Sequence, residues 1–214
     1  FKNLANSGIT FKLAEALFGA KNEVFTFPKG EKMTDSLRRN FLELVAISTI
    51  ADMMQEKEDN EVMIAEGLIF LENTFRPGLK AFKEIEEIED YSSTRELAQK
   101  IVSILNIAEP KDHLNESYFL LTETSLERAK ELIKKLLEKR IQRQARIREV
   151  VEEIEDVVLE KAKDNFVFEE NSGWPIPLLG TVASRICNKF QKPTFIVSKG
   201  EIKSRGSVRT PKGI

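Results

Sequence analysis

Residues 124–163 read TSLERAKELIKKLLEKRIQRQARIREVVEEIEDVVLEKAK, and this stretch carries the most regular pattern in the chain. Its apolar residues recur with helical spacing, from Leu126 and Ala129 through to Val158. Thr124 and Glu127 form a capping box that predicts the start of the helix. At 1.5 Å per residue, a helix of about forty residues is roughly 60 Å long. Because ordinary globular helices are much shorter, the stretch predicts a coiled coil or a connector between domains.

The residues that precede this stretch predict a helical region. Apolar positions over residues 9–20 and 34–47 form two helical faces. On this interpretation the second helix gives way to the small and β-branched residues 46–52, which end in Asp52. Apolar residues from Val62 to Leu71 predict a further helix, residues 76–78 open a short one, and a capping box beginning at Ser93 predicts the start of another.

The residues that follow the long stretch change to an alternation of strand and helix. Residues 165–169 predict a strand, residues 178–190 a helix, and residues 194–198 a second strand. Two strands joined through a helix at this close spacing predict a parallel pair. The sequence therefore predicts an α/β fold whose C-terminal part is a small α/β sheet unit.

The bulk composition narrows the classes of protein. Of 214 residues, 41% are hydrophobic and 32% are charged, so packed cores can form under a well-solvated surface. The single cysteine, Cys187, excludes an internal disulfide, and a reducing cytoplasm is the expected compartment. No stretch approaches the roughly 20 apolar residues of a membrane helix. The chain opens at Phe1 rather than at Met, and we expect both ends to lie inside a longer sequence.

Basic residues are concentrated in two parts of the chain, although the net charge is only −2. The first part runs from Lys134 to Arg148, where Glu138 is the one acidic residue, and a solvated helix face explains it as well as DNA does. The second part runs from Arg185 to Lys212 and is similarly poor in acidic residues.

The second basic part contains the stretch Gly206-Ser207-Val208-Arg209-Thr210. Glycine lets a backbone approach a ligand, hydroxyl groups donate hydrogen bonds, and a guanidinium can bind an oxyanion with two N–H groups. Together these groups can hold a phosphate from several directions. As a bare pattern, the stretch also fits an ordinary turn.

Asp52 is the carboxylate whose position is least expected. It ends an otherwise apolar run, where an unpaired charge would be costly to bury. Two interpretations stay open from the pattern alone. Asp52 is either a metal ligand, or a helix cap or surface residue.

Several stretches resemble motifs of the RecJ-type nucleases in the DHH phosphoesterase superfamily. Residues 7–17 (SGITFKLAEAL) resemble the GxGVAFKLxxAL segment of this family, and residues 44–52 (LVAISTIAD) resemble its LVALGTIAD motif. The family's ENRxLVxxGL, RPGLxAL, GW, GxVASR, RP and GSxRS elements are similar to residues 59–68, 76–81, 173–174, 179–185, 192–193 and 206–210. The resemblance covers nearly the whole chain in the family's order.

The resemblance implies two lobes joined by a long bridging helix. It assigns residues 1–90 to the C-terminal part of the DHH catalytic domain and residues 91–123 to a helical connector region. It assigns residues 124–163 to the bridging helix and residues 164–214 to the start of the DHH-associated substrate-binding domain.

The resemblance also implies an activity, that of an exonuclease for single-stranded DNA in repair or recombination. In the family, two divalent metals, Mn²⁺ or Mg²⁺, activate water for attack on a DNA phosphodiester. By this resemblance Asp52 is a catalytic residue and metal ligand. The residues implied to bind the phosphates of single-stranded DNA are Gly206, Ser207, Arg209 and Thr210, with Arg185 as a further candidate.

Some features of the family are missing from this sequence. The family's other metal ligands, in its DxD and DHH motifs, would precede Phe1, and Glu61 stands where the family has arginine. Two alternatives therefore stay open. One is a non-catalytic relative that binds DNA or serves as a replication scaffold, and the other is a phosphodiesterase for short oligonucleotides or cyclic dinucleotides. Because one aspartate cannot hold two divalent ions, we expect the 214 residues alone to be inactive.

Overall fold

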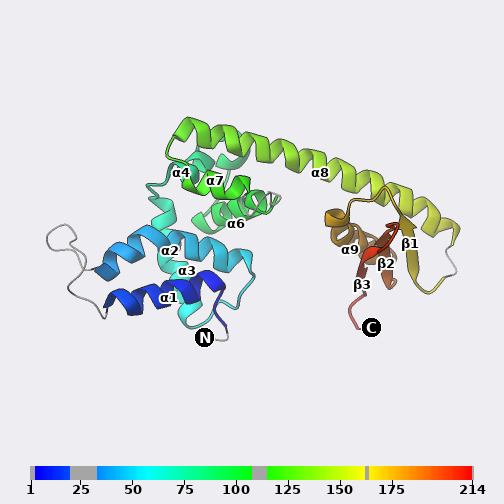
Figure 1. Ribbon diagram of the computed structural model, residues 1–214, viewed down its shortest axis with the longest axis horizontal. Helices are drawn as coiled ribbons and strands as arrows, with labels where there is room; N and C mark the ends of the chain where they lie inside the picture. The colour runs from blue at the N-terminus through cyan, green and yellow to red at the C-terminus, as the bar shows by residue number, and fades with distance from the viewer. Residues whose placement is uncertain (1–2, 20–32, 108–114, 162–163, 214) are drawn as a thin grey trace. The chain divides into compact units, whose positions relative to one another are not determined.

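The computed structural model describes residues 3–19, 33–107, 115–161 and 164–213 (Figure 1). The chain divides into two compact units at the junction between Leu137 and Glu138. The first unit is helical throughout its described part, and the second contains a small sheet. The expected α/β fold, with two lobes and a long connecting helix, is therefore confirmed. The four functional ranges implied by the resemblance stay predictions, because compactness alone does not test them.

The first unit is built from α1 (Asn6–Gly19), α2 (Met33–Ala51), α3 (Asp59–Glu72), α4 (Pro77–Lys83), α5 (Glu86–Glu89), α6 (Thr94–Leu105), α7 (Glu116–Thr122) and the first turns of α8 (Leu126–Glu160). Its main core contains side chains from α2 through to α8. A smaller core lies between α1, α2 and α3 and includes Phe11, Leu42, Val45 and Met63. Among the described residues, no helix is long and apolar enough to span a membrane.

Helix α2 continues to Ala51, so the expectation that it gives way at residues 46–52 is wrong for all but the last of them. The reason is close packing against α3. A Cβ added to Gly67 of α3 would lie 2.3 Å from the Leu42 carbonyl oxygen and 2.5 Å from the Ala46 Cβ. This tertiary contact overrides the weak helix preference of the β-branched residues in the run.

Helix α8 is the long helix that the sequence predicts, and it has 35 residues. Its start lies one residue later than the expected capping box, because Ser125 Oγ rather than Thr124 accepts the amide of Arg128, at 3.4 Å. The helix contributes buried side chains to the core of each unit: Ala129, Ile133 and Leu136 in the first, and Ile147, Val150, Ile154 and Val158 in the second. The interpretation of this stretch as a connector between domains is confirmed.

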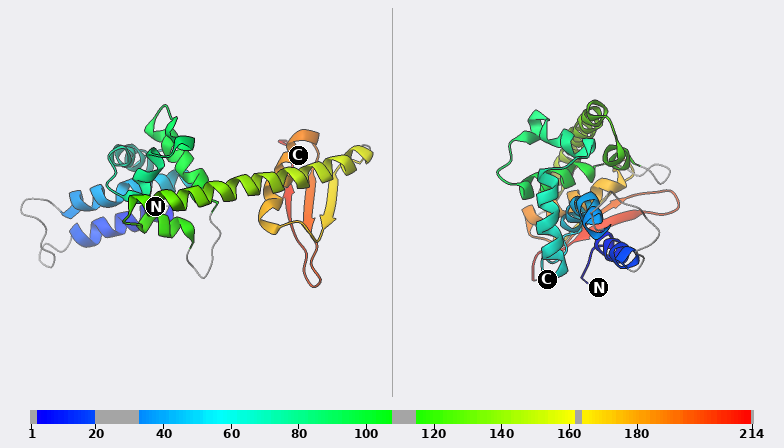
Figure 2. Two further views of the ribbon diagram at one scale, coloured as in Figure 1. Left: turned by 90° about the horizontal axis from the view of Figure 1, so that it is seen from above. Right: turned by 90° about the vertical axis from the view of Figure 1, so that its left-hand side faces the viewer.

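The second unit contains, after α8, β1 (Val167–Asn171), the 3-10 helix η1 (Ile176–Leu178), α9 (Leu179–Phe190), β2 (Thr194–Ser198) and β3 (Arg205–Arg209). The strand order is β1-β2-β3, with β2 in the middle (Figure 2). The strands β1 and β2 are parallel, as the sequence predicts, and α9 connects them. The strands β2 and β3 are antiparallel.

The two faces of this sheet differ. Val167 of β1 and Ile196 of β2 are buried in the core with side chains of α8 and α9. The opposite face carries the aromatic side chains of Phe166, Phe168 and Phe195, whose rings are in contact at centroid distances of 6.3 and 6.5 Å. Successive side chains of β3 are therefore divided between a helix-covered face and an aromatic face.

Candidate metal and phosphate sites

Asp52 lies in the turn that ends α2. The amide of Met54 donates to the Thr49 carbonyl oxygen at 3.3 Å, and the amide of Met53 donates to that of Ile50 at 3.1 Å. With Met53 at a φ of 50°, these two bonds form a Schellman motif whose C-cap residue is Asp52. Backbone geometry therefore fixes where Asp52 stands, and the turn places a methionine at the position that usually takes glycine.

The Asp52 carboxylate is exposed, and no ion pair or side-chain hydrogen bond to it is found among the residues that the structure describes. A negative charge at a helix C-terminus is unfavourable by about 0.3–1 kcal/mol. Helix stability therefore does not explain why an acid stands here. An exposed carboxylate at the C-cap position of α2 fits both interpretations that the sequence leaves open, a helix-cap or surface residue and a metal ligand.

The surroundings of Asp52 limit what it can do alone. Within residues 3–19, 33–107, 115–161 and 164–213, no group of three or more His, Cys, Asp or Glu side chains is placed to hold a metal ion. Carboxylate oxygens suit hard cations such as Mg²⁺ and Mn²⁺, so Asp52 fits the chemistry of one ligand. The described residues supply no such group around it.

Arg76 stands in the stretch that resembles the family's RPGLxAL element, yet its contacts are structural. Its Nε lies 2.8 Å from Glu43 Oε1, and the Glu43 side chain is 1% exposed. The two groups form an ion pair rather than an aligned hydrogen bond. Arg76 also donates to the Asn40 carbonyl oxygen and lies over the rings of Phe41 and Phe75. Burial raises the pKa of Glu43, and the side chain of Thr74 and the charge of Arg76 oppose that rise.

The stretch at residues 206–210 is not a turn, because residues 205–209 form β3. Its pairing with β2 depends on contacts far along the chain, which a local pattern of glycine and hydroxyl residues does not reveal. Gly206 fits the pairing because a Cβ there would lie 2.8 Å from the Ile196 carbonyl oxygen. The lack of a side chain at Gly206 therefore allows β2 to lie close to this strand. Thr210 follows the strand and is exposed.

Arg209 lies against the N-terminal part of α9, on the sheet face that this helix covers. Its Nε donates to Ser184 Oγ at 2.9 Å, and its Nη1 donates to Ser207 Oγ at 3.2 Å and to the Val208 carbonyl oxygen at 2.7 Å. A Cβ on Gly180 would lie 3.5 Å from Arg209 Nη2, so the guanidinium rests beside a helix turn without a side chain. In the described part of the chain, all of these partners are uncharged oxygens. The positive charge of Arg209 is therefore not neutralised by a neighbouring acid.

The structure brings together only part of the predicted phosphate site. Ser207 and Arg209 are in contact, whereas no hydrogen bond joins them to Arg185 or Thr210 in the described part of the chain, and both of these are exposed. Ser184 is the residue that sequence reasoning missed, although it lies in the stretch that resembles GxVASR. Its hydroxyl donates to the Gly180 carbonyl oxygen at 2.9 Å, four residues earlier. This helical spacing from Gly180 is the signal that could have shown the two residues on one face.

The first basic part of the sequence, on α8, has a partly structural role in the second unit. Arg143 and Arg146 donate to the carbonyl oxygens of Pro177 and Gly173, each at 3.3 Å. Glu153 of the same helix accepts the indole N–H of the buried Trp174 at 2.9 Å. The segment that resembles the family's GW element is therefore held by α8, and two of the basic residues are explained by this contact.

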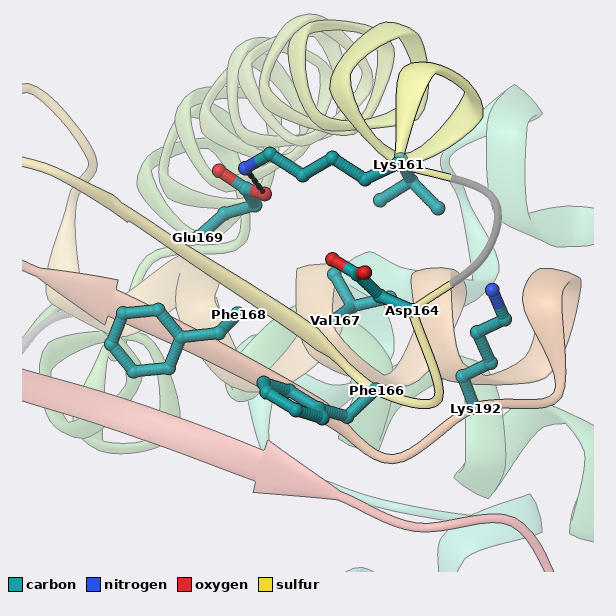
Figure 3. Close-up of a pocket in the computed structure, with 8 residues that line it drawn as sticks. Lys161, Asp164, Phe166, Val167, Phe168, Glu169 and Lys192 are labelled. Carbon is teal, nitrogen blue, oxygen red and sulfur yellow. Dashed lines mark hydrogen bonds and ion pairs between the residues drawn. The ribbon is translucent and has the colours of Figure 1, made fainter.

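A small hollow lies beside β1, on the side of α8 (Figure 3). Its volume is about 140 Å³, and its wall includes Lys161, Asp164, Glu169 and Lys192. Lys161 reaches across to Glu169 at 2.7 Å, and this hydrogen bond raises the pKa of Lys161. The charges around the hollow are of both signs, and none of its lining residues belongs to the Arg209 contacts. It is therefore a separate feature from the phosphate candidate.

Comparison with known proteins begins with sequence. No protein-family model matches the chain. Over its whole length the chain is 30% identical, across 223 residues, to the single-stranded-DNA-specific exonuclease RecJ of Bacillus subtilis (strain 168), and it covers 26% of that protein. It is 27% identical, across 226 residues, to the protein of the same description from Haemophilus influenzae, of which it covers 38%. The chain thus spans well under half the length of these curated relatives.

Solved structures extend the comparison to the fold. RecJ from Thermus thermophilus in complex with Mg²⁺ matches 92% of the chain with a TM-score of 0.68 and 21% identity, over 32% of that structure's chain. A structure of exonuclease RecJ bound to manganese matches 92% of the chain with a TM-score of 0.63 and 22% identity, over 52% of its chain. The fold therefore defines the class of protein, a two-lobed α/β protein with a long connecting helix of the kind these structures share. The sequence matches over the whole chain then identify it as RecJ-type, which confirms the resemblance seen in its motifs.

Proposed function

We propose that this chain works as part of a metal-dependent exonuclease that hydrolyses the phosphodiester bonds of single-stranded DNA, in repair or recombination. The observation that carries the proposal is how the side chain of Arg209 is held. Its guanidinium is oriented by Ser184 and Ser207, and no acid neutralises it among the described residues. The descriptions of the two curated relatives, both single-stranded-DNA-specific exonucleases, supply the substrate class.

Arg209 has the properties of a phosphate ligand. Nε and Nη1 are already engaged, so the N–H groups of Nη2 and the full charge are left for an oxyanion. A phosphate contact carries no sequence information, which suits an enzyme that removes nucleotides of any sequence. We expect Ser207 to share in the site and Arg185 to contribute only long-range attraction.

Asp52 is the residue of this chain that would hold a divalent metal, Mn²⁺ or Mg²⁺. Its carboxylate has the right chemistry and is exposed on a turn of fixed geometry. The remaining ligands of a two-metal site would come from the DxD and DHH motifs, which these 214 residues do not contain. When bound, such metals supply a water molecule activated for attack on phosphorus. The role left to this chain is to present one carboxylate and to hold the strand.

The test is Asp52→Ala in the complete protein, with Asp59→Ala as the matched control. Asp59 is an exposed acid in the first turn of α3, and it is paired with Lys12 at 2.9 Å. We expect Asp52→Ala to abolish cleavage at saturating Mn²⁺ while leaving DNA binding largely intact, and Asp59→Ala to retain cleavage. Substantial residual turnover in the Asp52 variant would show that Asp52 is a surface residue without a catalytic role.

A second candidate function is a non-catalytic DNA-binding or scaffold protein. The observation that favours it is the lack of any grouped metal ligands within the described residues. The complete protein would then bind single-stranded DNA through Arg209 and cleave nothing with either metal. Comparing cleavage of a long strand with that of a dinucleotide, in the same experiment, also distinguishes an exonuclease from a phosphodiesterase for short oligonucleotides.

A further inference from the structure

We propose that Asn60 is a positioning residue, which fixes the turn that carries Asp52 by tying it to the chain segment before α1. This inference rests on the role proposed above for Asp52. The role of Asn60 differs from that of Asp52, because in this proposal Asn60 contacts neither metal nor DNA. Its task is to hold backbone.

The contacts of Asn60 join two segments that are far apart in the sequence. Asn60 lies in the first turn of α3, and its side chain is 1% exposed. Its Nδ2 donates to the Gln55 carbonyl oxygen at 2.8 Å and to the Asn3 carbonyl oxygen, 57 residues earlier, at 2.6 Å. Both N–H groups of one amide are therefore used, one for the loop after Asp52 and one for the segment that leads into α1.

The loop held by Asn60 is otherwise weakly supported. Most of its side chains between Asp52 and Asp59 are exposed, so burial does little to fix it. Its two ends are also strained, since Met53 has a φ of 50° and Glu58 has a φ of 54° with a ψ of −126°. Such conformations persist only where the surroundings constrain the backbone. In the described part of the chain, the buried amide of Asn60 constrains this loop from inside the unit, and the exposed ion pair of Glu56 with Arg95 constrains it at the surface.

The choice of an asparagine here has a cost that packing does not explain. Its Oδ1 is buried and has no hydrogen-bond partner among the described residues. A buried polar atom without a partner is unfavourable, and an apolar side chain would avoid that cost. What an apolar side chain could not do is donate to two carbonyl oxygens at once. Residues behind a metal ligand commonly orient it in this way, and their loss typically lowers metal affinity by about 10–100-fold.

The structural test uses amide hydrogen exchange in the complete protein. In Asn60→Ala we expect the amides of Met53 and Met54, which close the turn, to exchange at least about tenfold faster, because two hydrogen bonds that restrain the loop are lost. The matched control is Asn40→Ala. The Asn40 amide donates to Ser36, within its own helix. This control should leave the exchange of those two amides unchanged.

The functional test uses the complete protein. For Asn60→Ala we expect the Mn²⁺ concentration for half-maximal cleavage to rise by about tenfold or more, with turnover largely recovered at saturating Mn²⁺. Binding of single-stranded DNA should not change. Asp52→Ala, in contrast, should not be rescued by metal, which separates a positioning role from a ligand role.

Each outcome decides the inference. Unchanged exchange at Met53 and Met54, or an unchanged Mn²⁺ dependence beside an inactive Asp52→Ala, overturns it. Should Asn60→Ala not fold, Asn60→Leu keeps a similar volume and removes the donor without burying a charge, and a failure of both variants to fold would show that Asn60 supports the whole unit rather than this turn. If Asp52→Ala retains cleavage, the proposed function fails, whereas faster exchange at the turn would still show that Asn60 holds it.

Discussion

Arg76 in the first unit and Arg209 in the second both stand in stretches that resemble family motifs. Their guanidinium groups have opposite kinds of partner. Arg76 is paired with the buried Glu43, bonded to a backbone carbonyl and packed on two aromatic rings. Arg209 is held by two serine hydroxyl groups and a backbone carbonyl, all uncharged. The charge of Arg76 is compensated by a buried acid, whereas the charge of Arg209 has only uncharged partners among the described residues.

This contrast separates structural from functional arginines within family-like stretches. Both stand in stretches that resemble family motifs, and both have a glycine within three positions. What distinguishes them is the acid 33 positions before Arg76, which only the fold brings into contact. An arginine oriented by neutral groups is prepared for a ligand, whereas one oriented by a buried acid already has its counter-ion.

The largest expected effect is on stability, from Arg76→Met. Removing one partner of a buried ion pair typically costs about 3–5 kcal/mol, since the other charge is left without compensation. We expect a loss at the lower end of that range, because the Arg76 side chain is 20% exposed. Arg209→Met should cost less than about 1 kcal/mol, as expected for an exposed side chain with neutral partners. Denaturant unfolding of both variants measures the two losses, and equal losses would show that both arginines support the fold to the same degree.

The pH dependence of the stability of Arg76→Met tests whether Glu43 is the group that loses its partner. Without its cation, Glu43 keeps the burial that raises its pKa in the folded state above the unfolded value. A group with a raised folded pKa binds more protons in the native than in the unfolded state, so stability falls as pH rises through that window. The deficit of the variant relative to the parent protein should therefore be smallest under acidic conditions, where Glu43 is protonated in both proteins, and grow as the pH rises through and above the raised pKa that Glu43 has in the parent fold. A deficit that does not change with pH would mean that Glu43 is not the affected group.

The next effect is on DNA binding, from Arg209→Ala. We expect single-stranded DNA affinity to fall by about tenfold or more, equally for all sequences, because a charge-assisted contact to phosphate is lost. The salt dependence should flatten by a slope of roughly 0.7, which corresponds to one phosphate contact on a single strand. Arg209→Lys should recover only part of the affinity, since a point charge does not reproduce the planar fork. A large loss of thermal stability with an unchanged salt slope would instead place Arg209 among the structural arginines.

A smaller effect is expected from Ser184→Ala. The Arg209 Nε loses its acceptor, but the charge and the contact with Ser207 stay. We expect affinity for single-stranded DNA to fall only a few-fold, about the effect of one neutral hydrogen bond, with the salt slope preserved. Titration of both variants at several salt concentrations separates orientation from charge. A slope change as large as that of Arg209→Ala would contradict the positioning role of Ser184.

The smallest effect concerns the turn at Asp52. Met53 is 90% exposed and has a φ of 50°, a conformation that glycine adopts without strain. Met53→Gly should therefore stabilise the first unit by up to about 1 kcal/mol, reduced by the greater freedom of glycine in the unfolded chain. Thermal unfolding measures this. A destabilised variant would show that the methionine side chain, despite its exposure, supports the turn.

The sequence predicts those parts of the fold that depend on local pattern. The long helix α8 follows from an apolar repeat sustained over dozens of residues, and the parallel pair of β1 and β2 follows from strand, helix and strand in close succession. The sequence does not predict the elements whose conformation depends on contacts between distant segments. β3 is a strand because β2 pairs with it, and α2 stays helical to Ala51 because α3 packs closely against it.

The candidate sites divide in the same way. Motif resemblance is enough to single out Asp52 and Arg209, since each stands inside a recognisable stretch. Ser184 and Asn60 also lie in family-like stretches, but the motifs do not reveal their roles. The role of Ser184 depends on a bond to a residue 25 positions away, and the amide of Asn60 reaches 57 positions back. Residues that contact a ligand can be proposed from motifs, whereas residues that hold them in place require the tertiary structure.

Helix α8 contributes to the cores of both units, and the aromatic residues allow the unfolding of each unit to be followed separately. The one tryptophan, Trp174, is buried in the second unit against Glu153 of α8, whereas both tyrosines, Tyr91 and Tyr118, belong to the first. Tryptophan fluorescence therefore reports on one unit, and tyrosine absorbance reports on the other. Following both signals through one denaturation experiment shows whether a single continuous helix makes two cores unfold as one cooperative system or lets each melt at its own midpoint.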